Sequence, residues 1–419
     1  MRAGIFFGAV LAGWLTLAQA ANKQPNPPSP LCIGSNCAAA PVAGGKVKWN
    51  PGHYAGSNGS LFGGTKATAW FASMDGALTN YPQFKGWRMW LTWGALEPSK
   101  GNYDFSQLDA LLDRLKTHYG SPRHLVITLY PQGPVTQWRS GDTGVIPGYI
   151  QQDPAYGPSP VSGSHGWWGI NSGGASTGGY EPALWRPAVM DRYIALLQAL
   201  GAHYDNDPYF EGVMFQEAVY HIVAAGSDYT NDAMTQQAKR LLNASVAAFP
   251  HTSVVFENTW GLGNPTQNQN FELWMVQNRI APGTADVVGE TAFLLPMPKN
   301  RPNAVNWGMA AYMGMTDISS TYSGGDLRTQ SRAMVDVEAD DIAGGYYSGS
   351  GGPFAPADIC VALNKRYKAS HAFWDHFMGS EKVRGVPIPD AAKWPNLAAA
   401  LAACPLTNTS YPPNYPAGN

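Results

Sequence analysis

The sequence predicts an α/β protein, a single-domain (β/α)8 or TIM barrel. From Lys46 onward, short runs rich in apolar and β-forming residues alternate with stretches of helical period. Strands and helices in alternation favour parallel pairing through helical crossovers. There is no second linker and no internal repeat of fixed period. Eight such strands are the number that closes a TIM barrel, and 419 residues fit the upper end of that fold's length. An open doubly wound sheet is the alternative.

The expected strands are short segments bounded by Gly, Pro or polar residues. They cover residues 46–54, 86–93, 124–130, 211–217, 253–260, 285–290, 333–338 and 370–377. The first is the least secure, because Pro51 interrupts it and proline is poorly tolerated inside strands.

Helical periodicity fills the intervals between these strands. Four leucines recur at helical spacing between residues 108 and 115, and an Ile and two Leu do so between residues 194 and 200. Further helical segments are expected at residues 233–249, 271–278 and 357–367.

Two segments precede the barrel domain, which spans residues 46–419. Residues 1–20 combine Arg2, an apolar run and the A-x-A sequence at 18–20, and predict a secretory signal peptide. An uncleaved anchor helix is the less favoured alternative. Residues 21–45 are rich in Pro and Ala and predict an N-terminal arm. No later run is apolar for the roughly 18 residues that a membrane span needs. We therefore expect an exported protein, secreted or periplasmic.

Four cysteines agree with an oxidising compartment. They allow three pairings. Pairing between near neighbours, Cys32–Cys37 and Cys360–Cys404, is our prediction. Zinc binding is the weaker alternative, because the chain has no C-x2-C pair with a matching partner.

Composition excludes several other classes of protein. Lys and Arg total 27 against 29 Asp and Glu, so the basic excess of a nucleic-acid-binding protein is missing. A hydrophobic content of 44% argues against wholesale disorder.

No Walker loop and no G-x-G-x-x-G after a strand occurs, and the histidines are scattered, so we expect no cofactor and no metal. The G-x-S-x-G match at 174–178 lies in a Gly-rich loop and lacks the strand-turn-helix context of serine hydrolases. Oligomeric state is left open.

Carboxylates and aromatic rings recur at the expected carboxyl ends of the strands, where barrel enzymes hold their active sites. Such a rim suits sugars, and cleavage of a glycosidic bond needs two carboxyl groups. Glu217 follows the apolar run 212–215 and is expected to be partly desolvated. Desolvation raises a carboxyl pKa and suits a general acid.

A resemblance supports this interpretation. Residues 93–98 (WGALEP), 101–106 (GNYDFS) and 108–109 (LD) resemble the W-x-x-L-E-P-x-x-G-x-Y-D-F-S-x-L-D segment of retaining glycoside hydrolases. These belong to the (β/α)8 superfamily that includes β-galactosidases, cellulases, mannanases and xylanases. The resemblance implies an acid/base glutamate ending strand four, here Glu217, and a nucleophile ending strand seven, here Glu338. Gln216 departs from the usual Asn before the acid.

The second carboxylate has competitors. Glu290 becomes the nucleophile if the strand count is off by one, and Glu257 is a third candidate. A separation of about 5–5.5 Å between the two carboxyl groups would give retention of configuration, and about 6.5–9.5 Å would give inversion.

Further residues are expected to contact substrate, each with a structural alternative. His53 and Gln216 can bond sugar hydroxyls, Arg88 can keep the nucleophile ionised, and Trp374 can form a platform under the sugar. The remaining candidates are Trp93, Trp260 and Glu290. His53 as a histidine under a loop, Arg88 in a salt bridge and Trp374 as a core aromatic are the alternatives. The long loop at residues 131–181 contains three tryptophans and predicts a structured lid or wall.

The expected function is that of an exported retaining glycoside hydrolase cutting a polysaccharide or oligosaccharide, with carbohydrate as its partner. A barrel that binds glycans without cleaving them is the alternative. A metal-dependent or serine hydrolase on the same scaffold is a third possibility.

Overall fold

The structure is a computed structural model of the chain. It describes residues 46–60, 65–129, 145–169, 180–215, 226–257, 265–284, 334–337, 360, 363–364, 367–374, 382–383, 386–387, 397–413 and 415–416. The predicted signal peptide, the N-terminal arm, Cys32 and Cys37 lie outside these residues, so these expectations stay predictions.

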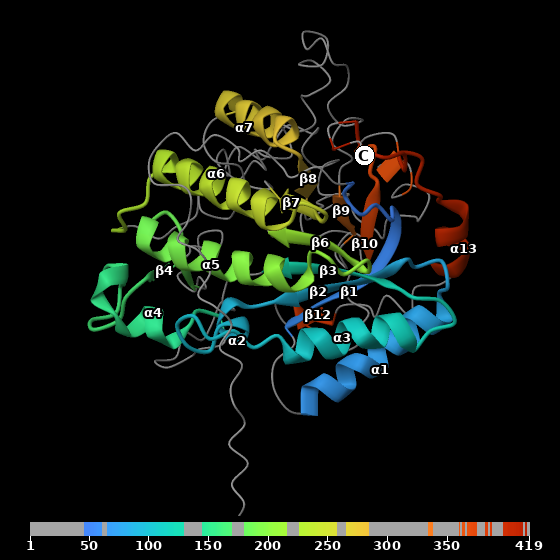
Figure 1. Cartoon of the computed structure of the whole chain (residues 1–419), viewed down its shortest axis with the longest axis horizontal. Helices are drawn as coiled ribbons and strands as arrows, with labels where there is room; N and C mark the ends of the chain where they lie inside the picture. The colour runs from blue at the N-terminus through green and yellow to red at the C-terminus, as the bar shows by residue number, and fades with distance from the viewer. Residues whose placement is uncertain are drawn as a thin grey trace, which may run out of the picture.

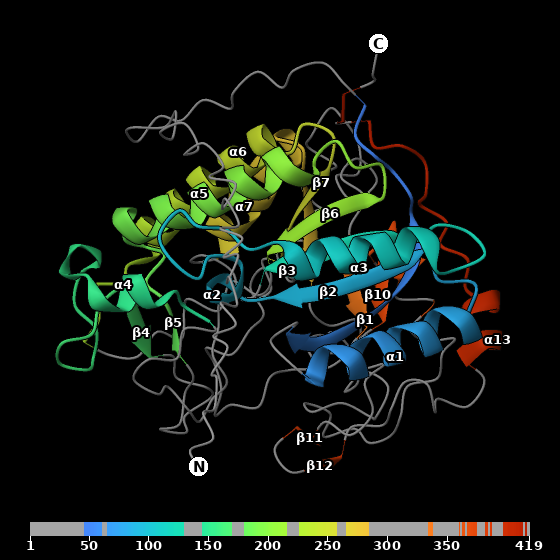
Figure 2. The ribbon, with the colours of Figure 1, turned by 60° about the horizontal axis from the view of Figure 1, so that its bottom comes forward.

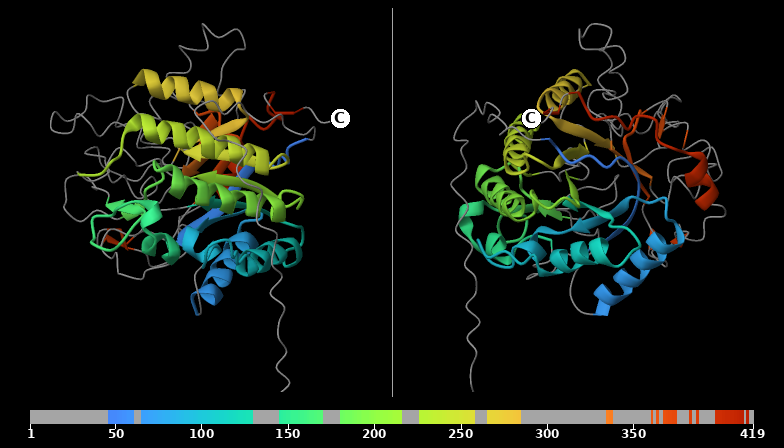
Figure 3. Two further views of the ribbon diagram at one scale, coloured as in Figure 1. Left: turned by 60° about the vertical axis from the view of Figure 1, so that its left-hand side comes forward. Right: turned by 45° about the vertical axis from the view of Figure 1, so that its right-hand side comes forward.

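Parallel strands form the centre of the molecule (Figure 3). They are β1 (Gly52–Ser60), β2 (Gly86–Leu91), β3 (His124–Leu129), β6 (Phe210–Phe215), β7 (Ser253–Glu257), β8 (Ile280–Thr284), β9 (Met334–Val337) and β10 (His371–Trp374). Their pairing order is β1-β10-β9-β8-β7-β6-β3-β2. β1 pairs in parallel with β10 on one side and with β2 on the other. The predicted α/β barrel is confirmed.

Helices lie outside the strands (Figure 1). The longer ones are α1 (Thr65–Asn80), α3 (Ser106–Thr117), α5 (Pro187–Tyr204), α6 (Asn231–Ala248) and α7 (Pro265–Gln277), and α13 (Leu397–Ala403) is short. The predicted leucine stripe of α3 is buried, as is the Ile194, Leu197 and Leu200 stripe of α5. α5 begins with a proline in its first turn, and the Thr230 hydroxyl caps α6 by accepting from the Ala233 N–H at 3.1 Å. No helix among the described residues is long and apolar enough to cross a membrane.

Alternating residues along each strand face either the barrel interior or the helices. The interior cluster consists of Tyr54, Val126, Met214, Val255, Ala281, Met334 and Phe373. On β2, Trp87 and Met89 belong instead to the larger core shared with the helices. Both faces of the barrel strands are therefore buried, which explains their nearly continuous apolar sequence.

Two barrel strands differ from the sequence prediction. β1 begins at Gly52 and not at residue 46, because residues 46–50 run along the C-terminal segment, where the Val47 N–H donates to the Tyr411 hydroxyl at 2.9 Å. His53 therefore lies near the start of β1, and its predicted place at the strand end is wrong. The sixth barrel strand, β8, spans Ile280–Thr284, whereas the strand predicted at residues 285–290 lies outside the described residues. Arg279, with φ 65°, turns the chain after α7. The sequence pattern did not predict β8, because Pro282 and Gly283 are residues that strand interiors disfavour.

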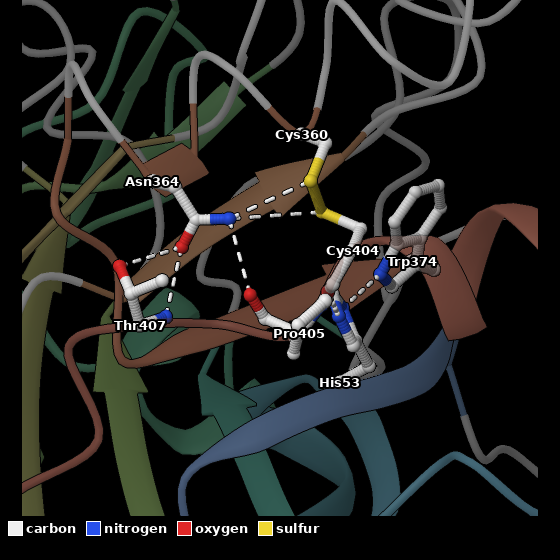
Figure 4. Close-up of a disulfide and its surroundings, with 7 residues drawn as sticks. All are labelled: His53, Cys360, Asn364, Trp374, Cys404, Pro405 and Thr407. Carbon is white, nitrogen blue, oxygen red and sulfur yellow. Dashed lines mark hydrogen bonds between the residues drawn. A yellow bond between two sulfur atoms is a disulfide. The ribbon is translucent and has the colours of Figure 1, made fainter.

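A disulfide fastens the C-terminal segment to the barrel. Cys360 and Cys404 are bonded, as predicted. Beside them, the Asn364 side chain donates to the Pro405 carbonyl at 3.2 Å and accepts from the Thr407 N–H at 2.8 Å (Figure 4). The cross-link joins residues separated by 44 positions in the sequence, and the Cys404 carbonyl oxygen lies 2.6 Å from His53 Nε2 on β1.

Candidate functional site

The chain between β3 and α5 makes a long excursion on one side of the barrel. It contains α4 (Gly148–Gln152), a 3-10 turn at Pro154–Tyr156, β4 (Trp167–Gly169) and β5 (Tyr180–Pro182). In Figure 2 the arrow of β2 points toward β4 and β5, so this excursion lies on the side of the carboxyl ends of the strands. The described part has regular elements and buried tryptophan, as expected for a structured wall.

β4 and β5 form an antiparallel hairpin with two different faces. One face carries Trp167 and Tyr180, whose rings meet edge-on with centroids 5.8 Å apart. The Trp167 indole N–H donates to the Ser164 hydroxyl at 2.7 Å. On the other face Trp168 lies directly opposite Glu181 in the strand register. Cross-strand partners share a face, so the indole and the carboxyl group are neighbours.

Glu181 is the most unusual carboxylate among the described residues. Its side chain is completely buried, and no described residue donates a hydrogen bond to either carboxyl oxygen. Burial raises its pKa to about 8, so the group keeps its proton at neutral pH. Sequence reasoning missed it, because nothing in Tyr180-Glu181-Pro182 indicates how deeply the residue is buried.

Ion pairing joins this excursion to the loop between β6 and α6. The Asp228 carboxylate accepts from the Trp185 indole N–H at 2.8 Å and from Arg186 Nη2 at 2.7 Å. The bonds from Arg186 hold the pKa of Asp228 below its usual range. Trp185 also meets the Tyr229 ring edge-on at 5.4 Å. The two loops are thereby fixed against each other, and the second of them is the loop in which Glu217 lies.

The segment that resembles glycoside hydrolases is organised around Glu97. Its carboxylate is fully buried at the end of α2 (Trp93–Leu96), just after β2. It accepts from the Trp93 indole N–H at 2.8 Å and from the Gly101 N–H at 2.8 Å, and it forms an ion pair with Arg192. Trp93 is only 1% exposed and packs on Tyr193 with ring centroids 4.9 Å apart. These contacts favour a structural role for Trp93, whose predicted contact with substrate stays a prediction.

Arg88 lies inside the barrel beside a carboxylate. Its Nη1 is 3.7 Å from Glu257 Oε1, and both side chains are fully buried. A Cβ at Gly283 would stand 2.9 Å from Glu257 Cγ, so glycine at that position on β8 leaves room for the carboxylate. The sequence expected Arg88 to pair with the nucleophile; the structure brings it to Glu257, the third candidate for that role.

His53 and Trp374 lie together in the wall of the barrel. The Trp374 indole N–H donates to His53 Nδ1 at 2.9 Å, and His53 Nε2 is 2.6 Å from the Cys404 carbonyl oxygen (Figure 4). Burial lowers the pKa of His53. Trp374 ends the eighth barrel strand, as predicted, and is 2% exposed. The described contacts favour the structural alternatives, so the predicted sugar contacts of both residues stay predictions.

Five predicted site residues lie outside the described part of the chain: Gln216, Glu217, Trp260, Glu290 and Glu338. Their roles stay predictions. The strands before the two catalytic candidates are described: β6, the fourth barrel strand, ends at Phe215, and β9, the seventh, ends at Val337. In the described residues, no group of three His, Cys, Asp or Glu side chains could hold a metal ion.

The amino end of the barrel holds a second completely buried glutamate, Glu211. Its carboxylate accepts from the Asn50 N–H at 2.5 Å and lies 3.0 Å from His124 Nδ1 and 3.5 Å from His371 Nε2. Burial by itself raises the pKa of Glu211, but the bond with His124 and the nearby imidazole of His371 outweigh that effect and lower the pKa to about 2.

Comparison with known proteins identifies the fold. No family model matches the chain, and no curated protein has a matching sequence. The catalytic domain of β-amylase from Paenibacillus polymyxa is similar in structure, with a TM-score of 0.50 and 9% identity over 86% of this chain and 99% of that one. A β-galactosidase from Marinomonas ef1 has a TM-score of 0.50 and 7% identity over 84% of this chain, which spans 58% of the galactosidase. The chain shares the barrel fold of these glycoside hydrolases.

Proposed function

We propose that this protein is an exported retaining glycoside hydrolase that cleaves a polysaccharide or oligosaccharide. The observation that carries the proposal is where two barrel strands end. Glu338 is the first residue after β9, and Glu217 is the second after β6. Parallel strands direct their carboxyl ends to one face of a barrel, the face where barrel enzymes act. Under this proposal the barrel is a complete (β/α)8 repeat in a single domain.

The proposed reaction proceeds by double displacement. Glu217 donates its proton to the leaving glycosidic oxygen while the Glu338 carboxylate attacks the anomeric carbon. A water molecule that gives its proton to Glu217 then attacks the glycosyl-enzyme ester and releases Glu338 and the sugar. Gln216 is suited to bond a neighbouring sugar hydroxyl, and Trp260 offers an aromatic face to the ring.

Because Arg88 pairs with Glu257, Glu257 is a further candidate for the nucleophile, and mutagenesis can test it. Inside a barrel, a guanidinium 3.7 Å from a carboxylate favours the ionised form that a nucleophile needs. Glu257, however, ends the fifth barrel strand, which is next to the fourth. Glu338 follows the seventh strand, where the resemblance implies the nucleophile. The resemblance of residues 93–109 to retaining glycosidases supports Glu338.

The test is a panel of polysaccharides and oligosaccharides assayed with purified protein. Glu217→Gln and Glu338→Gln are each expected to lose about 10³-fold or more in rate, because a proton donor or a nucleophile is removed. Glu257→Gln and Glu290→Gln are the comparisons that distinguish the nucleophile. Asp113→Asn, on the exposed side of α3, is the matched control and should keep full activity.

The stereochemistry of the first product, followed by NMR, tests the retaining mechanism. An initial product with the substrate's anomeric configuration is expected, and an inverted product would reject Glu338 as a nucleophile. Full activity in both the Glu217 and Glu338 variants would reject the catalytic assignment. Glycan binding without any new reducing ends would favour the non-catalytic barrel. Detection of the chain without residues 1–20 in the exported fraction tests export.

A further inference from the structure

The hairpin of β4 and β5 carries a carboxyl group that forms no hydrogen bond with the part of the chain that the structure describes. Glu181 is completely buried, and none of the described residues bonds to its oxygens. Buried polar side chains in native proteins nearly always have a partner, so each exception requires a physical explanation. A bound molecule that supplies the missing partner is one such explanation.

The surroundings of Glu181 indicate what such a molecule would be. Trp168 lies opposite it in the hairpin and is half-buried. A Cβ at Gly226 would lie 3.9 Å from Trp168 Cζ2, so the loop that contains Glu217 returns beside this indole. Tyr229, which follows in the same loop, is near enough for the charge of Glu181 to raise its pKa further, after burial has done so. The carboxyl group thus lies among aromatic rings on the side of the carboxyl ends of the strands.

We propose that Glu181 is a substrate-binding residue: as a neutral carboxylic acid it donates a hydrogen bond to a hydroxyl oxygen of a carbohydrate that packs on Trp168. This inference rests on the proposed action on glycans and adds a subsite to it. A sugar hydroxyl can accept from the acid's O–H and donate to its carbonyl oxygen, so one hydroxyl satisfies both orphaned atoms. The apolar C–H face of the same sugar suits the indole.

The ionisable groups that face this region are consistent with a neutral acid. Burial raises the pKa of Glu181 to about 8. The Arg186 guanidinium, 6.0 Å from the centroid of the Trp168 ring, is already paired with Asp228. Tyr229 titrates above the range in which Glu181 does. Loss of the proton from Glu181 between neutral and alkaline pH would therefore remove the donor while the rest of the region keeps its charge.

The test measures oligosaccharide binding by calorimetry in a Glu217→Gln background, so that binding is separated from cleavage. Glu181→Met keeps the volume of the side chain and removes both oxygens. It should weaken binding about tenfold or more without lowering the melting temperature, because an unpartnered carboxyl group is replaced by an apolar one. Glu181→Gln keeps a donor and an acceptor and should lose about threefold at most.

The pH dependence of the dissociation constant is the second readout. The affinity of the protein that retains Glu181 should fall as the pH rises past about 8, whereas the affinity of the Glu181→Gln variant should stay constant over the same range. Asp113→Asn is again the control.

The outcomes separate this inference from the proposed hydrolysis. Unchanged affinity in Glu181→Met overturns the inference, and wild-type cleavage of glycans would then leave the hydrolase proposal standing. Lost affinity in Glu181→Met together with no cleavage by the wild type supports the subsite and rejects the hydrolysis. Absence of binding to every oligosaccharide tested overturns the subsite.

Discussion

Glu181 and Glu211 are both completely buried glutamates, but the two ends of the barrel surround them differently. At the amino end, Glu211 has the Asn50 N–H and the imidazoles of His124 and His371 around it. On the side of the carboxyl ends, Glu181 has no hydrogen-bond donor from any described residue. The pKa of Glu211 is lowered to about 2, and that of Glu181 is raised to about 8.

The difference teaches that burial alone does not decide the state of a carboxyl group. Burial disfavours the charged form in both places, and only partners can reverse its effect. Glu97, on the carboxyl side, is also buried and has partners, because the Trp93 indole, the Gly101 N–H and Arg192 all bond to it. A buried carboxylate with partners supports the fold, whereas one without partners is a candidate for binding a ligand.

The largest expected effect concerns the pH dependence of folding at Glu181. The folded chain binds this proton more tightly than the unfolded chain, so its stability should fall as the pH rises from about 4.5 through about 8. A shift of this size corresponds to about 5 kcal/mol. Glu181→Gln should abolish this slope in chemical denaturation measured at several pH values.

A fall in stability with rising pH that persists in Glu181→Gln would contradict the comparison. Burial lowers the pKa of His53, so its contribution has the opposite sign and makes stability rise toward pH 6.5. The titration of Lys48 does not interfere with this measurement of stability against pH. Burial lowers its pKa to about 8 from 10.5, so its contribution makes stability rise between those pH values, above the window of Glu181. Lys48 also bonds to the carbonyls of Asp205 and Asp207 beyond the far end of α5, a helix about 27 Å long.

The next effect is the loss of the Glu211 cluster. Glu211→Gln should lower the free energy of unfolding by about 4 kcal/mol at neutral pH, because it leaves buried imidazoles without their carboxylate. In the wild type this contribution is full above pH 4.5 and should be lost, by about 3 kcal/mol, as the pH falls toward 2. Denaturation of both proteins across that range checks the prediction; equal stability at neutral pH would show that the cluster contributes nothing.

Smaller effects are expected at Glu97 and, smallest of all, at Asp228. Glu97→Gln should cost about 2 kcal/mol, since the partner Arg192 keeps 19% of its side chain exposed and recovers some solvation. Asp228→Asn is the comparison, because the Asp228 side chain is 56% exposed and its ion pair should be worth less than about 1 kcal/mol. Urea denaturation measures both, and a larger loss in Asp228→Asn would reverse the expected order.

The strand pattern of the chain predicted much of the fold. Regular spacing of apolar residues identified α3, α5, α6 and part of α7 but not α1, and β-rich runs overlapped every barrel strand except β8. Boundaries failed where tertiary contacts compete with local pattern. Residues 46–50 bond to the C-terminal segment and not to a barrel strand, and Gly283 lies in β8, where a Cβ would stand 2.9 Å from Glu257 Cγ.

The contacts of the predicted site residues could be inferred from the sequence less well than the fold. The sequence identified Arg88, His53, Trp93 and Trp374 as polar or aromatic residues near strands, but the described structure gives each a buried protein partner. The alternation of side chains along a strand indicates which face of the sheet a residue occupies. It does not indicate which residues of other strands contact that side chain.

By itself the sequence determined the alternation of strands and helices that makes a parallel barrel, because this follows from spacing along the chain. It favoured the pairing of Cys360 with Cys404 among the three that four cysteines allow, and the structure contains that bond. Only the tertiary structure decided which carboxyl groups are satisfied. Glu97 and Glu211 acquire donors from segments distant in sequence, whereas no residue in the described part of the chain donates to Glu181. Solvation and partnership are properties of the packed neighbourhood, so no local pattern can encode them.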